Sequence, residues 1–239
     1  TKNEFNSFAA DVDTIIQGET NSKLFYADAG LDVVGVGMQP IGDLMQLGDG
    51  TNYSSFESDG TLEFNGTATV WDDIYIPALG LGTVASIPDK INFLAAGGLK
   101  IYGFDGNATS EMLYGSFELK HKYKEGTDIS VHVHWSPTDA NAGNVKWQLE
   151  YTWINTDGTF GASATINIID STDSTAWKHL RADFSNISGT GKKIGSIIVF
   201  RIFRDPTDAD DTYASDAALL DIGCHFEIDT VGSRTMLVK

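Results

Sequence analysis

The chain has 239 residues, of which 41% are hydrophobic and 11% aromatic, and its formal net charge is -17 at neutral pH. A surface this acidic repels phosphate groups, so the composition argues against a nucleic-acid partner and against docking on anionic lipid. No apolar run approaches the roughly 18 residues that a transmembrane helix needs, so we expect no insertion into a membrane.

Residues 13 to 50 combine apolar runs of three to five residues with frequent Gly, Asp and Asn. Strands this short cannot bury enough surface within one chain to offset the entropy lost on ordering them. Several copies that wrap or stack together would turn open edges and apolar faces into a shared core. We therefore expect residues 1–50 to be an N-terminal attachment and oligomerisation segment. Its predicted interface residues are Ile15, Ile16, Leu24, Phe25, Val34, Val36 and Leu47.

The segment 23–37 contains Leu-Phe-Tyr-Ala-Asp-Ala followed by Asp-Val-Val-Gly-Val-Gly. It resembles a repeat common in phage fibre and other virion proteins, in which Leu-Phe-x-x-Asp-Ala precedes Asp-x-Val-Gly-Ile-Gly. Val33 stands where that repeat usually has Arg. The resemblance implies that the oligomer is a homotrimer.

Residues 51–77 are expected to form a connecting β-hairpin, because Asp59-Gly60 separates two alternating runs. This part of the chain reads Gly-Asp-x-x-Asn, then Asp-Gly-Thr-Leu, then Ala-Thr-Val-Trp-Asp-Asp. The series resembles uncharacterised phage structural proteins, in which it leads into the main domain. The C-terminal segment 226–234 continues the resemblance and closes the same domain.

Two later stretches alternate between apolar and polar residues, which is the pattern of a strand with one buried face. In the run 145–153 the odd positions are apolar or aromatic and the even positions are polar, and the run 129–135 has a similar alternation. We expect Trp147, Tyr151 and Trp153 to point inward, because a slip of one residue would expose all three rings.

Eight strands can be predicted from residue 99 onward, whereas residues 78–98 read as a long loop with at most one short helix. Eight antiparallel strands around an aromatic core are typical of a jelly roll. An immunoglobulin-like sandwich is the alternative, but its cysteine pair is missing, since Cys224 is the only cysteine. The expected fold is all-β: a short-strand oligomeric segment, the hairpin, and an antiparallel jelly-roll β-sandwich over 78–239. Cys224 lies in an apolar run and is expected to be a buried, inert thiol.

The pair His132 and His134 is the strongest candidate metal site, because residues two apart on a strand project from the same face. Gly126 precedes His132 by six residues, which matches the opening of the cupin motif, and Asp139 stands near the place of its glutamate ligand. The glycine that closes the cupin motif comes early in this sequence, and the second cupin motif is missing. We therefore predict no metal and no cofactor, with a solvated or interface face as the alternative role of the two histidines. His225 is the candidate third ligand.

Other residue patterns predict chemistry less specifically. The loop 205–211 contains four aspartates that could hold calcium, although a solvated acidic loop is favoured. The tryptophans could stack on sugar rings, but those on alternating strands are more often core. The strand carboxylates Glu118, Glu150 and Glu227 have no spacing that sets two of them across a cleft. No catalytic residue is assigned, and ligand-binding residues remain unknown.

Taken together, these patterns favour a non-enzymatic structural protein of a phage virion, of the fibre or capsid-decoration type, that displays a jelly roll on the particle surface. Its expected partners are further copies of itself in a homotrimer and other virion proteins of the capsid, collar or tail. One alternative is a carbohydrate-binding module that recognises a glycan on the host surface. A second alternative is a metal-dependent cupin-like enzyme.

Overall fold

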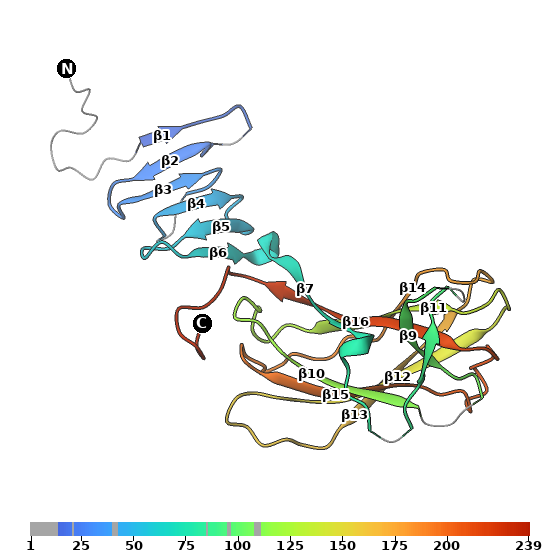
Figure 1. The fold of residues 1–239 in the computed structure, drawn as a ribbon. Coiled ribbons are helices and arrows are strands. Elements are labelled where there is room, and N and C mark those ends of the chain that lie inside the picture. The colour runs from blue at the N-terminus through green and yellow to red at the C-terminus, as the bar shows by residue number, and fades with distance from the viewer. Residues whose placement is uncertain (1–13, 21, 40–42, 85, 95–96, 108–110) are drawn as a thin grey trace. The chain divides into compact units, whose positions relative to one another are not determined.

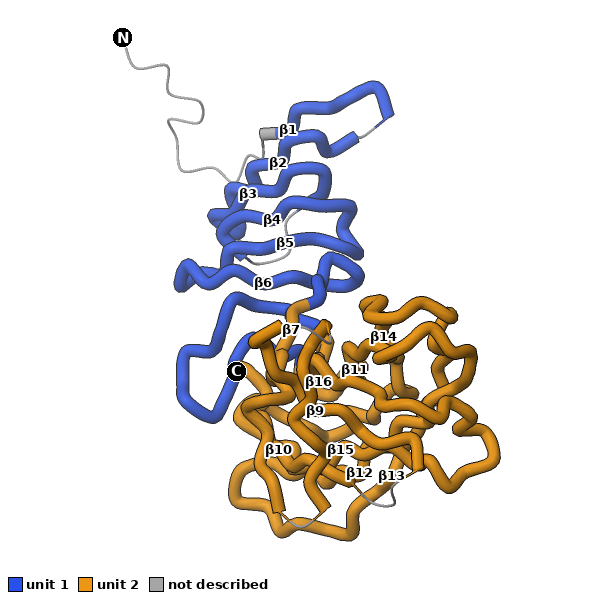
Figure 2. Tube along the Cα trace, turned by 45° about the vertical axis from the view of Figure 1, so that its right-hand side comes forward, with its two compact units in different colours: residues 1–71, 121–124, 227–239 blue, residues 72–120, 125–226 orange. Residues whose placement is uncertain are grey.

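The computed structural model describes the chain except residues 1–13, 21, 40–42, 85, 95–96 and 108–110. The described chain is built from β-strands, with two single turns of 3-10 helix at Gly66–Ala68 and Ala78–Gly80 (Figure 1). It divides into two compact units (Figure 2): residues 1–71, 121–124 and 227–239, and residues 72–120 and 125–226. Within the described parts, no helix has the length and apolar character needed to cross a membrane.

The first unit contains one sheet of six short strands in chain order. All neighbouring strands are antiparallel except β3 and β4, which run parallel. The predicted hairpin at Asp59-Gly60 is confirmed: it joins β5 to β6, and Gly60 has a φ of 86° that favours glycine. The predicted boundary at residue 50 falls inside this sheet, between β4 and β5. The strands are β1 (Thr14–Ile16), β2 (Phe25–Asp28), β3 (Val33–Val36), β4 (Met45–Gly48), β5 (Tyr53–Phe56) and β6 (Leu62–Asn65).

The second unit is an antiparallel β-sandwich, which confirms the predicted fold class. One sheet has the order β10-β15-β12-β13, and the other has the order β14-β11-β16-β9-β8 with β7 also paired to β16. Its strands are β7 (Val70–Pro77), β8 (Asp89–Asn92), β9 (Lys100–Phe104), β10 (Met112–Glu118), β11 (Ile129–Pro137), β12 (Asn144–Ile154), β13 (Ala164–Ser171), β14 (Leu180–Asp183), β15 (Ile197–Arg204) and β16 (Ala217–Ile228). The first two residues of β7 and the last two of β16 belong to the first unit.

Strand β8 corrects the prediction that residues 78–98 form a loop with at most a short helix. Its residues Asp89–Asn92 pair with β9 at the edge of the sheet. A four-residue run in which only Ile91 is apolar has no alternation that could be read from the sequence. Pairing with β9 therefore stabilises the strand conformation of these residues, although their own strand propensity is weak.

The core lies between the two sheets and contains a cluster of aromatic rings among aliphatic side chains. Trp147 of β12 is fully buried and makes edge-to-face contacts with Phe104 of β9 and Trp135 of β11, at centroid distances of 5.2 and 6.2 Å. Trp153 is also buried, while Tyr151 is half-buried. The predicted alternation is thus confirmed for Trp147 and Trp153, whereas Tyr151, contrary to the prediction, is not buried. Cys224 is buried as predicted, and burial raises the pKa of its thiol to about 12.

Candidate functional site

The structure brings the three candidate histidines together on one face of the sheet that contains β11. In the ladders of β11, His132 is opposite Gly223 of β16 and Asp183 of β14, and His134 is opposite Asp221 and Arg181. His225 follows two residues after Gly223 on β16. These strands and β7 enclose a pocket of about 310 Å3, which we call the histidine pocket. It is lined by Asp73, Ile74, Tyr75, His132, His134, Arg181, Asp221, Gly223 and His225.

His132 is buried, with 4% of its surface exposed, which corrects the expectation of a solvated or interface position. Its ring lies 4.9 Å from that of His134 and 4.7 Å from that of His225, measured between centroids. It also lies against Gly223, where an added Cβ would be 2.2 Å from His132 Nε2. Burial, reinforced by the positive charge of Arg181, lowers the pKa of His132 to about 4. The ring is therefore neutral at physiological pH.

The other polar groups of the histidine pocket are partly paired. His134 Nδ1 lies 2.7 Å from Nε2 of His179, and its other ring nitrogen lies 4.0 Å from Asp221 Oδ1. Burial lowers the pKa of His134 as well. His225 Nε2 pairs with Asp73 Oδ1 at 3.1 Å. His179 belongs to this cluster although it is 45 residues from His134 in the chain, which no spacing rule would have shown.

The arrangement is not a converged metal centre. Among the residues that the structure describes, no three His, Cys, Asp or Glu side chains are placed to hold one metal ion. Asp139, the candidate cupin ligand, does not line the pocket and accepts hydrogen bonds from Tyr213 Oη at 3.1 Å and Ser215 Oγ at 2.5 Å. That no metal is bound remains a prediction, and elemental analysis of the purified protein is its test.

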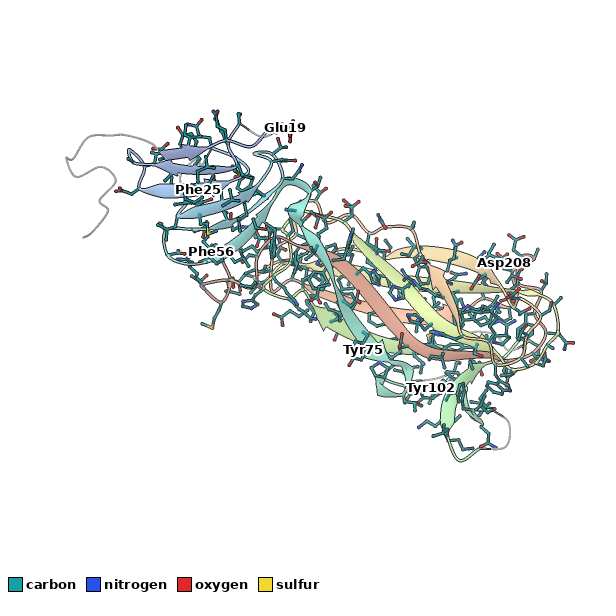
Figure 3. All side chains as sticks on the ribbon, turned by 90° about the horizontal axis from the view of Figure 1, so that it is seen from above. Glu19, Phe25, Phe56, Tyr75, Tyr102 and Asp208 are labelled. Atoms are coloured by element: carbon teal, nitrogen blue, oxygen red, sulfur yellow. The ribbon has the colours of Figure 1, made fainter. Side chains whose placement is uncertain are left out.

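The aspartates of the acidic loop 205–211, after β15, bind side chains of the sandwich, and we call this loop the clamp. Asp211 accepts two hydrogen bonds from the buried guanidinium of Arg204, at 2.7 and 2.9 Å. Asp208 pairs with Lys146, and Asp205 accepts a hydrogen bond from Gln148 at 2.6 Å. Three of the four aspartates thus neutralise or hydrogen-bond side chains of the sandwich. Asp208 is labelled in Figure 3.

A second candidate site lies on the outer face of the β10-β15-β12-β13 sheet. Cross-strand pairing places Tyr114, Arg201 and Glu150 in one row across β10, β15 and β12. Arg201 Nε donates to Glu150 Oε2 at 2.5 Å, and its guanidinium lies 5.0 Å from the centroid of the Phe203 ring. An open pocket of about 350 Å3 surrounds this row, which we call the outer-sheet site. It is lined by Tyr114, Glu150, Tyr151, Thr152, Ser163, Val199, Phe200 and Arg201.

Glu150 is an ionised, oriented carboxylate in this site. Hydrogen bonds from Ser163 Oγ and from Arg201 lower its pKa. Of the other candidate carboxylates, Glu227 pairs with Lys124 at 3.0 Å, and Glu118 does not line this pocket. The sequence indicated Glu150 as a candidate carboxylate but did not indicate Tyr114, Arg201 or Phe203. The alternation of the run 197–204 could have indicated an outward-facing Arg201 and Phe203, but not their partners on other strands.

No protein-family model and no curated protein matches this sequence. Solved structures match only distantly. The CBM36-1 domain of a multidomain xylanase from the hindgut metagenome of Trinervitermes trinervoides is 8% identical, with a TM-score of 0.34 over 64% of this chain and 96% of that one. The infectious bursal disease virus Gx strain is 11% identical, with a TM-score of 0.36 over 77% of this chain and 40% of that one. The CBM22-2 xylan-binding domain from Paenibacillus barcinonensis Xyn10C is 9% identical, with a TM-score of 0.28 over 55% and 89%. Similarities of this size assign neither a family nor a function.

Proposed function

We propose that this chain is a non-enzymatic recognition protein whose β-sandwich binds a neutral oligosaccharide at the outer-sheet site. The observation that supports this best is the row of Tyr114, Arg201 and Glu150 in an open pocket, with Phe203 beneath the guanidinium. Aromatic rings bury the apolar face of a pyranose, while a paired guanidinium and carboxylate offer a donor and an acceptor side by side. Neighbouring hydroxyl groups of a sugar can bond to both.

The same geometry argues against hydrolysis at this site. A general acid needs a carboxyl group with a raised pKa, whereas the hydrogen bonds of Ser163 and Arg201 lower that of Glu150. Glu118 and Glu227 do not line the pocket. The role that remains for Glu150 is to accept hydrogen bonds and to hold Arg201 in place.

A glycan array followed by calorimetric titration of the best oligosaccharide tests the proposal. Tyr114→Ala is expected to weaken binding by about 5- to 150-fold, if a sugar ring stacks on it with the roughly 1–3 kcal/mol that a nucleic-acid base gains on an aromatic side chain. Tyr75→Ala is the matched control, since Tyr75 is 72% exposed on β7 and lines the histidine pocket instead. Absence of binding to any arrayed glycan, or an equal loss in both variants, would contradict a glycan site on this face.

A second proposed role is that of a virion structural protein of the fibre or capsid-decoration type, displayed on the surface of a phage particle as a homotrimer. It is supported by the sequence resemblance of segment 23–37 and by the exposed apolar residues Ile16, Leu47 and Phe56 in the strands of the first unit. The expected partners are other virion proteins, and both roles can coexist in one chain. Mass spectrometry of purified particles, with immunogold labelling by an antibody to residues 72–226, is the test. Particles that contain none of the protein would overturn this role and leave glycan binding untouched.

A further inference from the structure

The sheet of the first unit sorts its side chains by polarity, although each strand is short. Paired residues in neighbouring strands project from the same face, and residues two apart along one strand do so as well. Applied to the pairing of β1 to β6, this rule places most of the apolar side chains on one face, which we call the ladder face, whereas Ile15, Tyr26, Val33 and Tyr53 lie on the other. The ladder face consists of Ile16, Phe25, Ala27, Val34, Val36, Met45, Leu47, Ser54, Phe56, Leu62 and Phe64.

The register refines the interface predicted from the sequence. Ile16, Phe25, Val34, Val36 and Leu47 all belong to the ladder face. Ile15 is on the opposite face, and Leu24 lies before the first residue of β2. Phe56, Leu62 and Phe64, which the predicted interface did not include, extend the ladder face over β5 and β6; Phe25 and Phe56 are labelled in Figure 3.

The two faces of this sheet are buried in the opposite way to the one that would stabilise a single chain. No ladder-face residue is buried, and Ile16, Leu47 and Phe56 are exposed. On the opposite face Gln46 and Ser55 are fully buried, together with Tyr26 and Val33. A stable sheet normally places its apolar face in the core and leaves the polar face to water. The ladder face therefore requires a cover from outside its own sheet.

The distribution of charge in the chain favours further copies of the same chain as the partner that covers the ladder face. None of the ladder-face residues is charged, whereas the chain has a formal net charge of -17. Copies that met through an acidic surface would oppose like charges, which is unfavourable. At the ladder face two or more acidic chains can make contact without placing a carboxylate in the contact. Asp28 and Glu63 lie in these strands but, by the same alternation, do not interrupt the apolar ladder: Glu63 faces away, and Asp28 ends β2.

The ladder face is too small to form a stable interface between two chains by itself. Six strands about 4.8 Å apart and roughly four residues long give a strip on the order of 24 Å by 13 Å. A stable pairwise interface buries about 800 Å2 on each partner, which exceeds the area of this strip. Strips arranged around a symmetry axis enclose a core and shield each other's long edges, as closed cyclic oligomers do.

We propose that the ladder face binds the ladder faces of further copies of this chain and so forms the shared core of a homo-oligomer. The inference does not rest on glycan binding. It identifies the contact surface of the assembly that the second role requires, and it can hold even if the protein is absent from virus particles.

The neighbouring residues Ile15 and Ile16 provide a matched test, because they are 43% and 54% exposed on opposite faces of edge strand β1. The intact chain, of 25.8 kDa, is expected to have a multiple of that mass by light scattering. Ile16→Glu and Leu47→Glu should weaken association by at least about 100-fold, while Ile15→Glu should leave it unchanged. The two ladder-face variants should differ from Ile15→Glu because only they would bury a carboxylate in the interface without a partner. Emission from the buried tryptophans of the second unit checks that the sandwich stays folded.

Cysteine cross-linking gives a second measurement that does not depend on a disruptive substitution. Leu47→Cys is expected to form disulfide-linked dimers under mild oxidation, and Ile15→Cys is not. The native Cys224 does not interfere because it is buried. A monomeric mass for the unaltered chain, or an oligomer that survives both Glu substitutions on the ladder face, would overturn the proposal.

Discussion

Removing the carboxylate of Asp211 should destabilise the β-sandwich strongly, because it would leave the guanidinium of Arg204 buried without its counter-ion. Both side chains are 1% exposed, and they are joined by two hydrogen bonds of 2.7 and 2.9 Å. Arg204 also donates to the carbonyl oxygens of Phe104 and Ser215, at 3.2 and 2.7 Å. This one side chain therefore joins β15 to the end of β9 and to the segment that precedes β16.

The expected cost follows from the burial of the pair. Breaking a buried ion pair by removing one partner typically costs about 3–5 kcal/mol. The carbonyl acceptors still solvate part of the charge, so we expect about 3 kcal/mol for Asp211→Ala. For a unit of this size that corresponds to a fall in Tm of roughly 6–12 °C.

Urea denaturation followed by tryptophan fluorescence measures this cost, because Trp135, Trp147 and Trp153 are buried in the same sandwich. Asp210→Ala is the matched control: Asp210 is exposed in the same loop, and its loss should change the free energy of unfolding by less than about 0.5 kcal/mol. A cost below about 1 kcal/mol for Asp211→Ala would refute the clamp. A cost that appears only with added calcium would show that the loop is a calcium site.

Three further predictions concern the core and the histidine pocket. Trp147→Ala should cost about 3–5 kcal/mol in urea denaturation, since the ring is fully buried against Phe104; a cost below about 1 kcal/mol would show that the ring is not part of the core. The folded-state pKa of His132, about 4, lies below its ordinary value near 6.5, so the stability contributed by the neutral ring should be fully present above pH 6.5 and should fall by about 3 kcal/mol as the pH drops from 6.5 through 4. His132→Leu should remove that part of the pH dependence, and an unchanged pH profile would contradict the buried neutral ring. Gly223→Ala should lower Tm by several degrees, because a Cβ there meets the His132 ring at 2.2 Å, whereas His132→Ala should relieve the clash in the double variant.

Local patterns predicted those features that depend on neighbours in the sequence. The two-residue period of 145–153 determines which face of β12 is buried, and Asp59-Gly60 determines a tight turn, so both were readable. β8 was missed because its four residues have no period of their own. The burial of His132 was missed because it depends on Gly223 and Arg181, which only the pairing of β11 with β16 and β14 brings to it.

The two proposed surfaces show the same division. The apolar residues of β1 to β4 were predicted to form an interface from the sequence, but the opposite orientation of Ile15 required the register. The outer-sheet site required even more, since Tyr114, Glu150 and Arg201 come from three strands that are neighbours in the sheet and not in the chain.

NMR mapping of amide signals during titration with an oligosaccharide tests the central claim most directly, because it locates the ligand without altering the protein. The account predicts saturable shifts that cluster on β10, β15 and β12 around Tyr114, Arg201 and Glu150. Shifts that cluster instead on the histidine pocket, or a spectrum that no glycan perturbs, would contradict it.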